Sequence, residues 1–520
     1  MTSGLLLALS WPTYGFSLLI FVGFVPLLLA EKRIRTSYAK RKGLKVFLTG
    51  YIAFVIWNAI TTWWIWYSSV FGMFFAVLMN ALFMALLFWL YHFTARKLPQ
   101  KIHLVFLAAL WLSFEKLHLT WPFSWPWLTL GNVFSENPLW IQWYEYTGVF
   151  GGSLWIWIVN IGFFKTFDTY LARRNKRRLS AGIAKNVLLI AIPVIISLFI
   201  YKTEAEPEEP VDVVVLQPNV DPYSEKYNTS NPEVAKMLFA MADEKINGET
   251  DFIIAPETVF ARNMPVDDFD RSYLRADIKN YVDNRQHINF LSGISFIKWM
   301  NDKDEITDMS NRYSDSLWYN DYNSAFLINA TDSTQLYHKS RLVVGVEHFP
   351  LKSILEPILG NIMLDLGGTV ATKTTQKERS VFTAADPAFK AAPIICYESV
   401  YGEFVTGYVK NKANFLVIIT NDGWWSDTQG HQQHLSYARL RAIETRRSIA
   451  RSANTGISAL IDQKGEIISS LPYNTKGALS GSIGINNEIT FYVKYGDYIA
   501  RLAYFTAGML FLFRLAKKKK

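Results

Sequence analysis

The chain has 520 residues, of which 50% are hydrophobic, 15% are aromatic and only one is a cysteine. A single cysteine excludes an intrachain disulfide framework. The formal net charge is +9, but the basic residues gather in short segments between long apolar runs, which argues against a nucleic-acid-binding protein and for a membrane protein.

Apolar runs fill residues 1–201, and they predict an N-terminal membrane domain because about 20 apolar residues span a bilayer as a helix. A mixed polar stretch, 202–495, predicts a soluble domain large enough for its own core. Residues 496–520 are expected to form one more spanning helix and a basic tail. The candidate spans are 15–30, 44–66, 71–94, 103–117, 144–164, 185–201 and 499–515.

The start of the chain leaves the number of helices open. The apolar stretch 4–10 is too short to cross a membrane alone, so it is either a half-helix or the end of a helix continuous with the next one. Seven or eight helices are therefore expected in total. A signal peptide is the competing interpretation, although no basic region precedes the apolar run.

Basic segments alternate with connections that lack Lys and Arg. Segments 31–45 and 165–185 each hold seven Lys or Arg and segment 95–101 holds three, whereas 67–70 and 118–143 hold none. By the positive-inside rule the basic segments and the basic tail are cytoplasmic, and the soluble domain lies on the opposite side of the membrane. The tryptophan-rich connection 118–143 is expected on the outer surface of the bilayer, as an aromatic belt or as a lipid-handling surface.

From residue 210 the hydrophobic pattern changes to short β-branched runs. These predict strands at 211–217, 251–257, 288–296, 324–330, 392–399, 414–420, 448–454, 456–462 and 465–471. Helices are predicted between them, at 231–247 and 436–447, so the domain is α/β or layered α+β. His431 and His434 lack a third metal ligand and are expected in a solvated loop. Arg439, Arg441, Glu444 and Arg447 are expected on a solvated helix face with local ion pairs.

Three reactive side chains lie at the edges of β-type runs in this domain: Glu257, Lys339 and Cys396. A thiol at its ordinary pKa is mostly protonated and needs a base, which a carboxylate provides. An ammonium group can stabilise the oxyanion that forms when a thiolate attacks a carbonyl. Taken singly, the three residues could equally be a core cysteine, a helix cap and a surface charge.

The residues around these three positions resemble the nitrilase superfamily of carbon–nitrogen hydrolases. The similar motifs are PETVF (256–260), HKSRLV followed by Glu347 (338–347), and ICYES (395–399). The resemblance implies an α-β-β-α sandwich. Together with the multi-span N-terminal domain, these motifs resemble one family in particular, the apolipoprotein N-acyltransferases. Further stretches similar to this family are FSWPWLTLGN (123–132), VEHFP (346–350), NDGWWSDTQGHQQHLSYARLRAIE (421–444) and RSANTGISALID (451–462).

The resemblance implies a role for each matching residue. It makes Cys396 the nucleophile, Glu257 the general base and Lys339 the oxyanion-stabilising cation. Further matches are the supporting residues Glu347, Tyr397 and Glu398, and the substrate-binding or lid residues Tyr227, Trp424 and Trp425. NDGWWS stands where the family more often has NDAWFG, and the N-terminus is shorter than usual.

Members of this family take an acyl chain from a phospholipid, usually phosphatidylethanolamine, onto the cysteine as a thioester. They then transfer it to the N-terminal amine of a diacylglyceryl-cysteine apolipoprotein, the last step of lipoprotein maturation. The resemblance thus implies a multi-pass protein of the bacterial inner membrane with a periplasmic catalytic domain. Neither a metal nor another cofactor is expected, and nucleic acid is not a partner.

Three alternatives remain open at this point. A membrane-tethered nitrilase or amidase acting on a small amide or nitrile would explain the three reactive residues but leave the membrane half unused. A non-catalytic membrane scaffold would keep the sandwich for binding only. A transporter would fit the number of spans, although no charged residue is clearly committed to a span centre.

Overall fold

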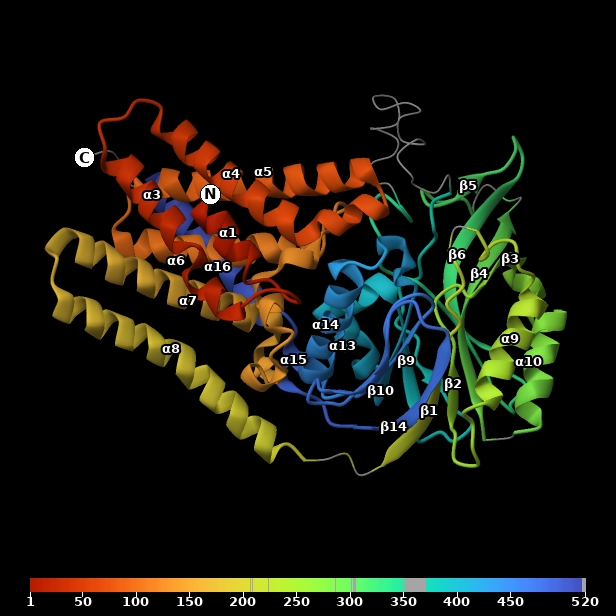
Figure 1. Ribbon diagram of the computed structural model, residues 1–520. Coiled ribbons are helices and arrows are strands. Elements are labelled where there is room, and N and C mark those ends of the chain that lie inside the picture. The colour runs from red at the N-terminus through yellow and green to blue at the C-terminus, as the bar shows by residue number, and fades with distance from the viewer. Residues whose placement is uncertain are drawn as a thin grey trace. The chain divides into compact units, whose positions relative to one another are not determined.

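A computed structural model describes residues 1–516 except 206, 208, 223, 286, 301, 303, 304, 349 and 351–370. The chain forms two compact units. The helical unit comprises residues 1–66, 70–204 and 495–520, and the sandwich unit comprises 67–69 and 205–494 (Figure 1). The last four lysines of the predicted basic tail lie outside the described residues.

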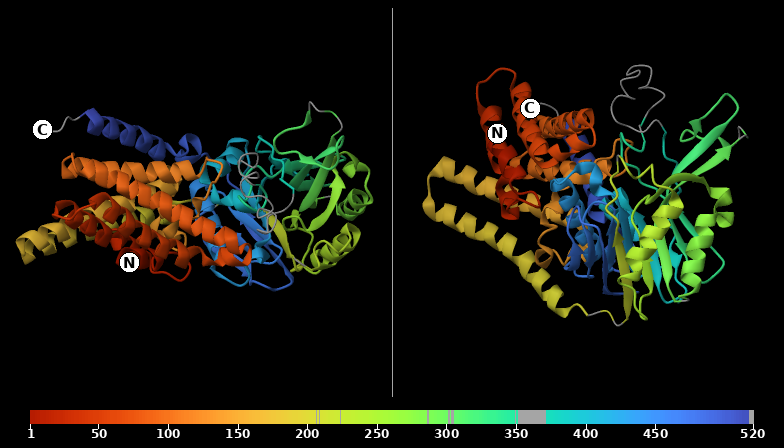
Figure 2. Two further views of the ribbon diagram at one scale, coloured as in Figure 1. Left: turned by 90° about the horizontal axis from the view of Figure 1, so that it is seen from above. Right: turned by 45° about the vertical axis from the view of Figure 1, so that its right-hand side comes forward.

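The helical unit consists of α-helices joined by short turns and 3₁₀ segments. Its α-helices are α1 (Thr2–Ala8), α2 (Ile20–Gly23), α3 (Val25–Thr36), α4 (Lys42–Thr62), α5 (Val70–Ala95), α6 (Gln100–His118), α7 (Tyr144–Arg173), α8 (Lys176–Thr203) and α16 (Tyr498–Ala516). Its 3₁₀ segments are η1 (Ser17–Leu19), η2 (Trp63–Tyr67), η3 (Pro126–Leu128), η4 (Leu130–Phe134) and η5 (Pro138–Trp140). Helices α7 and α8 form a hairpin (Figures 1 and 2).

Five helices among the described residues are long and apolar enough to cross a membrane: Lys42–Tyr67, Val70–Ala95, α7, α8 and α16. The expected span 15–30 is instead broken into η1, α2 and α3, with Pro26 in the first turn of α3. Proline lacks an N–H group and therefore favours a helix start over a helix interior. The apolar stretch 4–10 falls mostly within the short separate helix α1.

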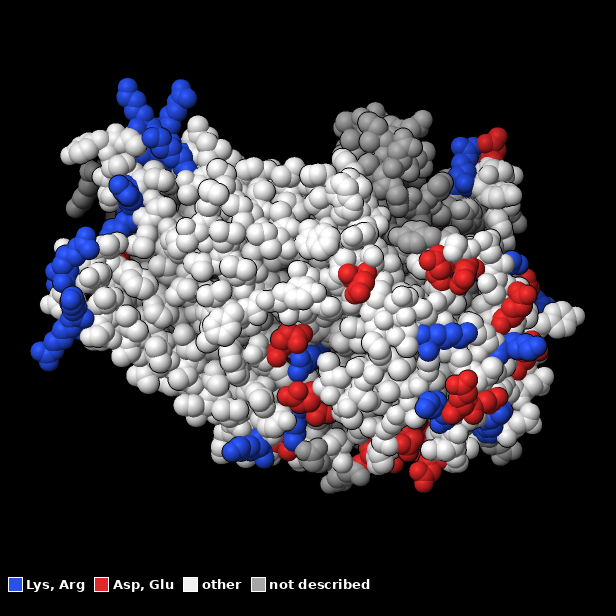
Figure 3. Space-filling view, viewed as in Figure 1, with Lys and Arg blue, Asp and Glu red and all other residues white. Residues whose placement is uncertain are grey.

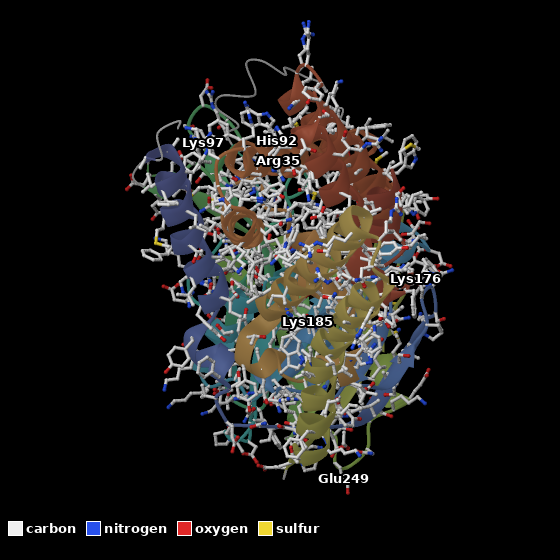
Figure 4. All side chains as sticks on the ribbon, turned by 90° about the vertical axis from the view of Figure 1, so that its left-hand side faces the viewer. Arg35, His92, Lys97, Lys176, Lys185 and Glu249 are labelled. Atoms are coloured by element: carbon white, nitrogen blue, oxygen red, sulfur yellow. The ribbon has the colours of Figure 1, made fainter. Side chains whose placement is uncertain are left out.

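The ends of several helices carry the basic segments and meet at one end of the helical unit. Lys32 of α3 donates to Asp168 of α7 at 2.6 Å, and Arg514 of α16 donates to the carbonyl of Phe93 in α5. Lys and Arg gather at this end beside a broad face without charged side chains (Figure 3). Arg35 near the end of α3, Lys97 after α5 and Lys176 at the start of α8 are visible when this end is viewed directly (Figure 4).

The connection 118–143 differs from the expected surface loop. Residues 126–135 are buried inside the helical unit. The backbone N–H of Leu130 donates to Glu115 and that of Gly131 donates to Ser153. Because these backbone groups find partners inside the unit, the middle of the segment does not need water or lipid headgroups. The middle of the connection is therefore packed inside the helical unit and is not an exposed loop.

The sandwich unit contains two sheets. The first has the order β14-β1-β2-β4-β6-β5, with β3 also paired to β4 and β7 to β6; the second has the order β13-β12-β11-β10-β9-β8. The first sheet is built from β1 (Pro210–Gln217), β2 (Phe252–Ile254), β3 (Phe260–Pro265), β4 (Asn289–Met300), β5 (Asn311–Arg312), β6 (Trp318–Ile328), β7 (Gln335–His338) and β14 (Gly477–Gly484). The second is built from β8 (Phe382–Thr383), β9 (Lys390–Ile395), β10 (Phe415–Thr420), β11 (Ile449–Ala453), β12 (Ser458–Ile461) and β13 (Ile467–Leu471).

The two sheets face each other and helices cover their outer faces. The rings of Phe252 in β2 and Phe415 in β10 meet edge to face at 5.2 Å across the sheets. Helices α9 (Asn231–Asp243) and α10 (Tyr273–Asp283) cover the first sheet, and α13 (Gly402–Lys410) and α14 (Gln429–Thr445) cover the second (Figure 1). Among the described residues, the remaining helical segments are α15 (Phe491–Tyr495), η6 (Val266–Arg271), η8 (Cys396–Val400) and η9 (Asp422–Trp425). The predicted combination of an apolar helical region and an α-β-β-α sandwich is confirmed.

Candidate active site

Glu257 lies in a tight turn between β2 and β3. It is buried, and the next residue, Thr258, has a φ of +42°, a conformation that L-residues rarely adopt. The turn packs directly on Gly293 of β4, where an added Cβ would lie 2.4 Å from the backbone nitrogen of Thr258 and 2.7 Å from the Cα of Glu257. Glycine at 293 therefore makes room for the turn that carries the carboxylate.

Lys339 follows β7 and lies between two carboxylates. Its Nζ donates to Glu257 Oε1 at 3.0 Å and to Glu347 Oε1 at 2.9 Å. Burial alone would lower the pKa of Lys339, but these carboxylates outweigh it and raise that pKa well above its usual value. The same ammonium, with hydrogen bonds from Val343 and Asn323, holds the pKa of Glu347 low despite burial. Lys339 is therefore a permanent cation.

Asn323, on β6, joins the two carboxylates from the other side. Its amide nitrogen donates to Glu257 Oε1 at 2.7 Å and to Glu347 Oε1 at 3.0 Å. Asn421, after β10 of the second sheet, donates its backbone N–H to Glu257 Oε2 at 3.1 Å. Neither asparagine was singled out from the sequence. Together they fix the orientation of the Glu257 carboxylate.

Cys396 directly follows β9 and opens η8. Its φ is +50°, so the nucleophile candidate occupies a sharp, strained turn at the end of a strand. Burial and the nearby charge of Glu257 raise the pKa of the Cys396 thiol well above its usual value, while Lys339 acts in the opposite direction. The three predicted residues therefore share one electrostatic environment, and the thiol is protonated at neutral pH.

Glu398 is fully buried two residues after the cysteine. Its Oε1 accepts hydrogen bonds from Tyr337 and from the backbone of Ser340, both at 2.6 Å, and its Oε2 accepts from the backbone of Ile395 at 2.8 Å. Burial raises the pKa of Glu398 to about 7 despite these donors. This carboxylate ties the segment after Lys339 to the residue before Cys396.

A second buried network, which the sequence did not reveal, lies behind Cys396. Asp422 Oδ2 accepts from Arg451 at 2.7 Å, and Asp422 Oδ1 lies 3.0 Å from His434 Nδ1. The other ring nitrogen of His434 lies 3.2 Å from the carbonyl oxygen of Cys396. Although burial favours protonation, Arg451 and His434 hold the pKa of Asp422 well below its usual range. The network supports the backbone of the cysteine turn.

This network corrects the expectation that His431 and His434 lie in a solvated loop, because both belong to α14 and are buried. Ligand atoms of Cys396, Asp422 and His434 lie within 4.8 Å of one another, as in a metal site. However, Asp422 and His434 already bind each other, and the guanidinium of Arg451 places a fixed positive charge where it opposes a metal ion.

The arginines of α14 also differ from the expected solvated helix face. Arg439, Arg441, Glu444 and Arg447 are all buried. Arg441 donates to the carbonyls of Ser399 and Val400, which close η8, and pairs with Glu444 at 2.8 Å. Carbonyl acceptors from distant segments thus compensate for the burial of these charges.

The remaining predicted site residues differ in how deeply they are buried. Tyr397 is buried, with its ring edge to face with Tyr401 at 5.3 Å, and burial raises its pKa well above the usual value. Trp424 and Trp425 lie in η9 and are half-buried. Tyr227 is 57% exposed, in the segment between β1 and α9. Burial and the charges of Glu257 and Asp321 raise the pKa of Tyr227, and the ring of Trp425 meets that of His434 edge to face at 5.6 Å.

Comparisons with known proteins match both units. Residues 3–162 match the family model "Apolipoprotein N-acyltransferase N-terminal domain", and residues 305–487 match "Carbon-nitrogen hydrolase". An apolipoprotein N-acyltransferase of Chlorobaculum tepidum is 28% identical and aligns with 100% of this chain and 96% of its own. One from Geobacter metallireducens is also 28% identical, with 100% and 94% covered.

Among solved structures, Nit3 of Saccharomyces cerevisiae, a member of the nitrilase superfamily, has 13% sequence identity and a TM-score of 0.37. The alignment covers 53% of this chain and 90% of Nit3. The two family models match successive parts of one chain, and both of these relatives align along its whole length. Over its whole length the chain is therefore similar to the apolipoprotein N-acyltransferases, which supports an acyltransferase built on a nitrilase-like domain.

Proposed function

We propose that the protein transfers an acyl chain from a membrane phospholipid, through a thioester on Cys396, to the N-terminal amine of a diacylated apolipoprotein. The observation that carries this mechanism is the shared environment of Glu257, Lys339 and Cys396, in which the thiol is protonated and a hydrogen-bonded carboxylate lies close by. A protonated thiol requires a base as it attacks, and Glu257 is the candidate.

In the first half-reaction Glu257 takes the thiol proton while the sulfur of Cys396 bonds to the ester carbonyl carbon of the phospholipid. The ammonium of Lys339 stabilises the oxyanion, since only two of its three N–H groups are engaged by carboxylates. The intermediate collapses as the carbon–oxygen ester bond breaks. Glu257 returns the proton to the leaving alkoxide, which releases a lysophospholipid and leaves the acyl thioester.

In the second half-reaction the amine of the apolipoprotein attacks the thioester carbon. The new carbon–nitrogen bond forms, the carbon–sulfur bond breaks, and Glu257 moves a proton from the amine to the sulfur of Cys396. The cycle thus ends with the free thiol and an N-acylated lipoprotein. Splitting the exchange into two steps at a reactive thioester lowers the barrier that a direct ester-to-amide exchange would face.

We further propose that residues 202–495 form a periplasmic catalytic domain held at the inner membrane by helices on both sides of it in the chain. The basic end of the helical unit would face the cytoplasm, in accordance with the positive-inside rule. Both lipid substrates are anchored in the outer face of a bilayer, so a domain tethered there meets them without leaving the membrane. Phosphatidylethanolamine is the proposed donor.

The central test uses the purified protein with phosphatidylethanolamine that carries an isotopically labelled acyl chain. Mass spectrometry of the peptide that contains Cys396 should show the labelled acyl adduct, and hydroxylamine should remove it. Adding a diacylated lipopeptide should discharge the adduct and give an N-acylated lipopeptide. Release of free fatty acid with no lipopeptide product would instead favour a hydrolase.

Two variants connect the test with the proposed roles. Cys396→Ser should remain folded and form no thioester, while Glu257→Gln should keep the thiol but form the acyl-enzyme at a strongly reduced rate. Glu249→Gln, an exposed Glu in the same unit, is the matched control and should behave as the wild type. A normal rate in Glu257→Gln would refute the base role.

Orientation is tested by alkaline phosphatase fusions. A fusion after residue 201 should be active because it reaches the periplasm, and one near residue 175, in the basic α7–α8 connection, should be inactive. The reverse pattern would overturn the proposed orientation.

A further inference from the structure

A second lysine lies close to the reactive cluster and has no part in the mechanism above. Lys226, between β1 and α9, is only 5% exposed. Its Nζ donates to the hydroxyl of Thr258, the residue that follows Glu257. Among the described residues it has no other hydrogen-bond acceptor and no carboxylate within ion-pair distance. A buried ammonium with two N–H groups left over is costly unless an anion approaches it.

Two further observations, one electrostatic and one geometric, place this ammonium near the reactive cluster. Burial lowers the pKa of Lys226, as do the charges of Lys373 and Lys339. The charges of Glu257 and Cys396 raise it. Its Nζ also lies 5.9 Å from the ring centroid of Trp424, at the outer range of a cation–π contact. Lys226 therefore lies between the turn of the proposed base and a predicted lid residue.

The charge balance of the cluster gives Lys226 a role. Two carboxylates, Glu257 and Glu347, surround a single ammonium, Lys339. While the thiol is protonated, this group has a net charge of −1. Moving the thiol proton to Glu257 and forming an oxyanion on the substrate leaves that net charge unchanged. The ammonium of Lys373 does not neutralise this net charge, because its Nζ is paired with Asp321 at 2.7 Å.

We propose that Lys226 is a second catalytic cation of the acyltransferase, whose ammonium binds the oxyanion of the tetrahedral intermediate together with Lys339. This inference rests on the proposed function and extends it by one residue. Lys226 neutralises the cluster when protonated, so the oxyanion forms in a site without excess negative charge. In a buried site, where charges interact strongly, this difference acts directly on the barrier.

The inference has a pH signature. Burial lowers the pKa of Lys226 to about 8, with Glu257 and Cys396 limiting the shift and Lys373 and Lys339 adding to it. As pH rises through this value, Lys226 loses its charge and acylation of Cys396 should slow. The pKa of Lys339 is raised well above its usual value, so Lys339 stays charged over the same range. A fall in rate near pH 8 therefore reports on Lys226.

The test measures the single-turnover acylation of Cys396 between pH 6 and 9.5, with two donors. One donor is labelled phosphatidylethanolamine, and the other is p-nitrophenyl acetate, whose reaction forms the same kind of oxyanion but needs no phospholipid site. Lys226→Met should slow acylation by both donors about 10²-fold, the effect of losing one oxyanion donor. Lys236→Met, which changes an exposed lysine of α9, should leave both rates unchanged.

Two further variants separate charge from packing. Lys226→Arg keeps its charge at high pH, so the fall in rate near pH 8 should disappear. If arginine does not fit, Lys226→Ala should regain rate with added ethylammonium but not with tetramethylammonium. A wild-type rate in folded Lys226→Met, or a fall near pH 8 that persists in Lys226→Arg, would overturn the inference. If the wild type reacts only with p-nitrophenyl acetate, the phospholipid mechanism fails, whereas the test of Lys226 still stands.

Discussion

Replacing Glu398 with glutamine changes one oxygen into an NH₂ group and leaves the shape of the side chain intact. Most isosteric changes of this kind are mild at a surface, but at Glu398 both oxygens accept backbone N–H groups. An amide has only one acceptor oxygen. Whichever way the glutamine is oriented, its NH₂ group must face a backbone donor that cannot rotate away.

The less costly orientation can be identified from the distances. With the oxygen in the Oε1 position, the bonds from Ser340 and Tyr337 are kept, and Tyr408 can turn its hydroxyl to accept. The NH₂ group then faces the backbone nitrogen of Ile395, which lies 2.8 Å from the present oxygen. One buried donor without an acceptor costs about 1–3 kcal/mol. We therefore expect a loss of about 2 kcal/mol in the free energy of unfolding, or about 3 °C in Tm for a unit of this size.

The functional loss should exceed the loss in stability because Ile395 directly precedes the nucleophile. A displacement of the strained Cys396 turn moves the sulfur relative to Glu257, and a misplacement of about 1 Å costs about 10²-fold in rate. The assay combines thermal unfolding of the purified protein with single-turnover formation of the acyl-enzyme. Glu249→Gln is again the control. If Glu398→Gln matched the wild type in both Tm and rate, the assignment of Glu398 as the acceptor that holds this turn would be wrong.

Three other changes test separate parts of the site. Gly293→Ala should push the Thr258 turn by several tenths of an ångström and reduce the rate of acyl-enzyme formation at least 10-fold. Gly248→Ala is the control, because an added Cβ at this position meets no atom within 4 Å. Equal rates in the two variants would show that the turn adapts to the added methyl group. Asn323→Leu should leave both carboxylates without a shared donor and destabilise the sandwich by about 2 kcal/mol, as measured by chemical unfolding, and an unchanged midpoint would contradict this. Burial lowers the pKa of His338 to about 4, and because the unfolded chain takes up this proton near pH 6.5, stability should fall as pH drops from 6.5 towards 4. His338→Phe should flatten this fall by up to about 1.4 kcal/mol per pH unit, and an identical slope would exclude His338 as its source.

The sequence predicted those strands that form continuous β-branched runs, such as β1 and β10, because fully buried strands are apolar at every position. It missed β14, with the sequence GALSGSIG, and β7, with QLYH, because small and polar residues give no such signal. These two strands are defined by their pairing with β1 and β6. Strand pairing over long sequence distances is not visible in a local window.

Glu257, Lys339 and Cys396 could be singled out as candidates because a carboxylate, a lysine and a lone cysteine are chemically distinctive. Asn323 could not be identified from its residue type, because asparagine is common at many kinds of site. It lies two residues before the buried Ala325 on the same face of β6, so the two-residue period of a strand gave only a weak indication that it points inward. Arg441 was misread for another reason. Its carbonyl acceptors on Ser399 and Val400 are about 40 residues away, so an amphipathic pattern within α14 could not reveal burial.

The site is assembled across the two sheets of the sandwich. The first sheet provides the elements that lead to Glu257 and Lys339, and the second provides the strand that ends at Cys396. The backbone hydrogen bond from Asn421 to Glu257 crosses between them at 3.1 Å. Because the proposed base and the proposed nucleophile belong to different sheets, the packing of Phe252 on Phe415 contributes to their separation. Core packing between the sheets is therefore part of the catalytic geometry, since close-packed interiors transmit even small displacements.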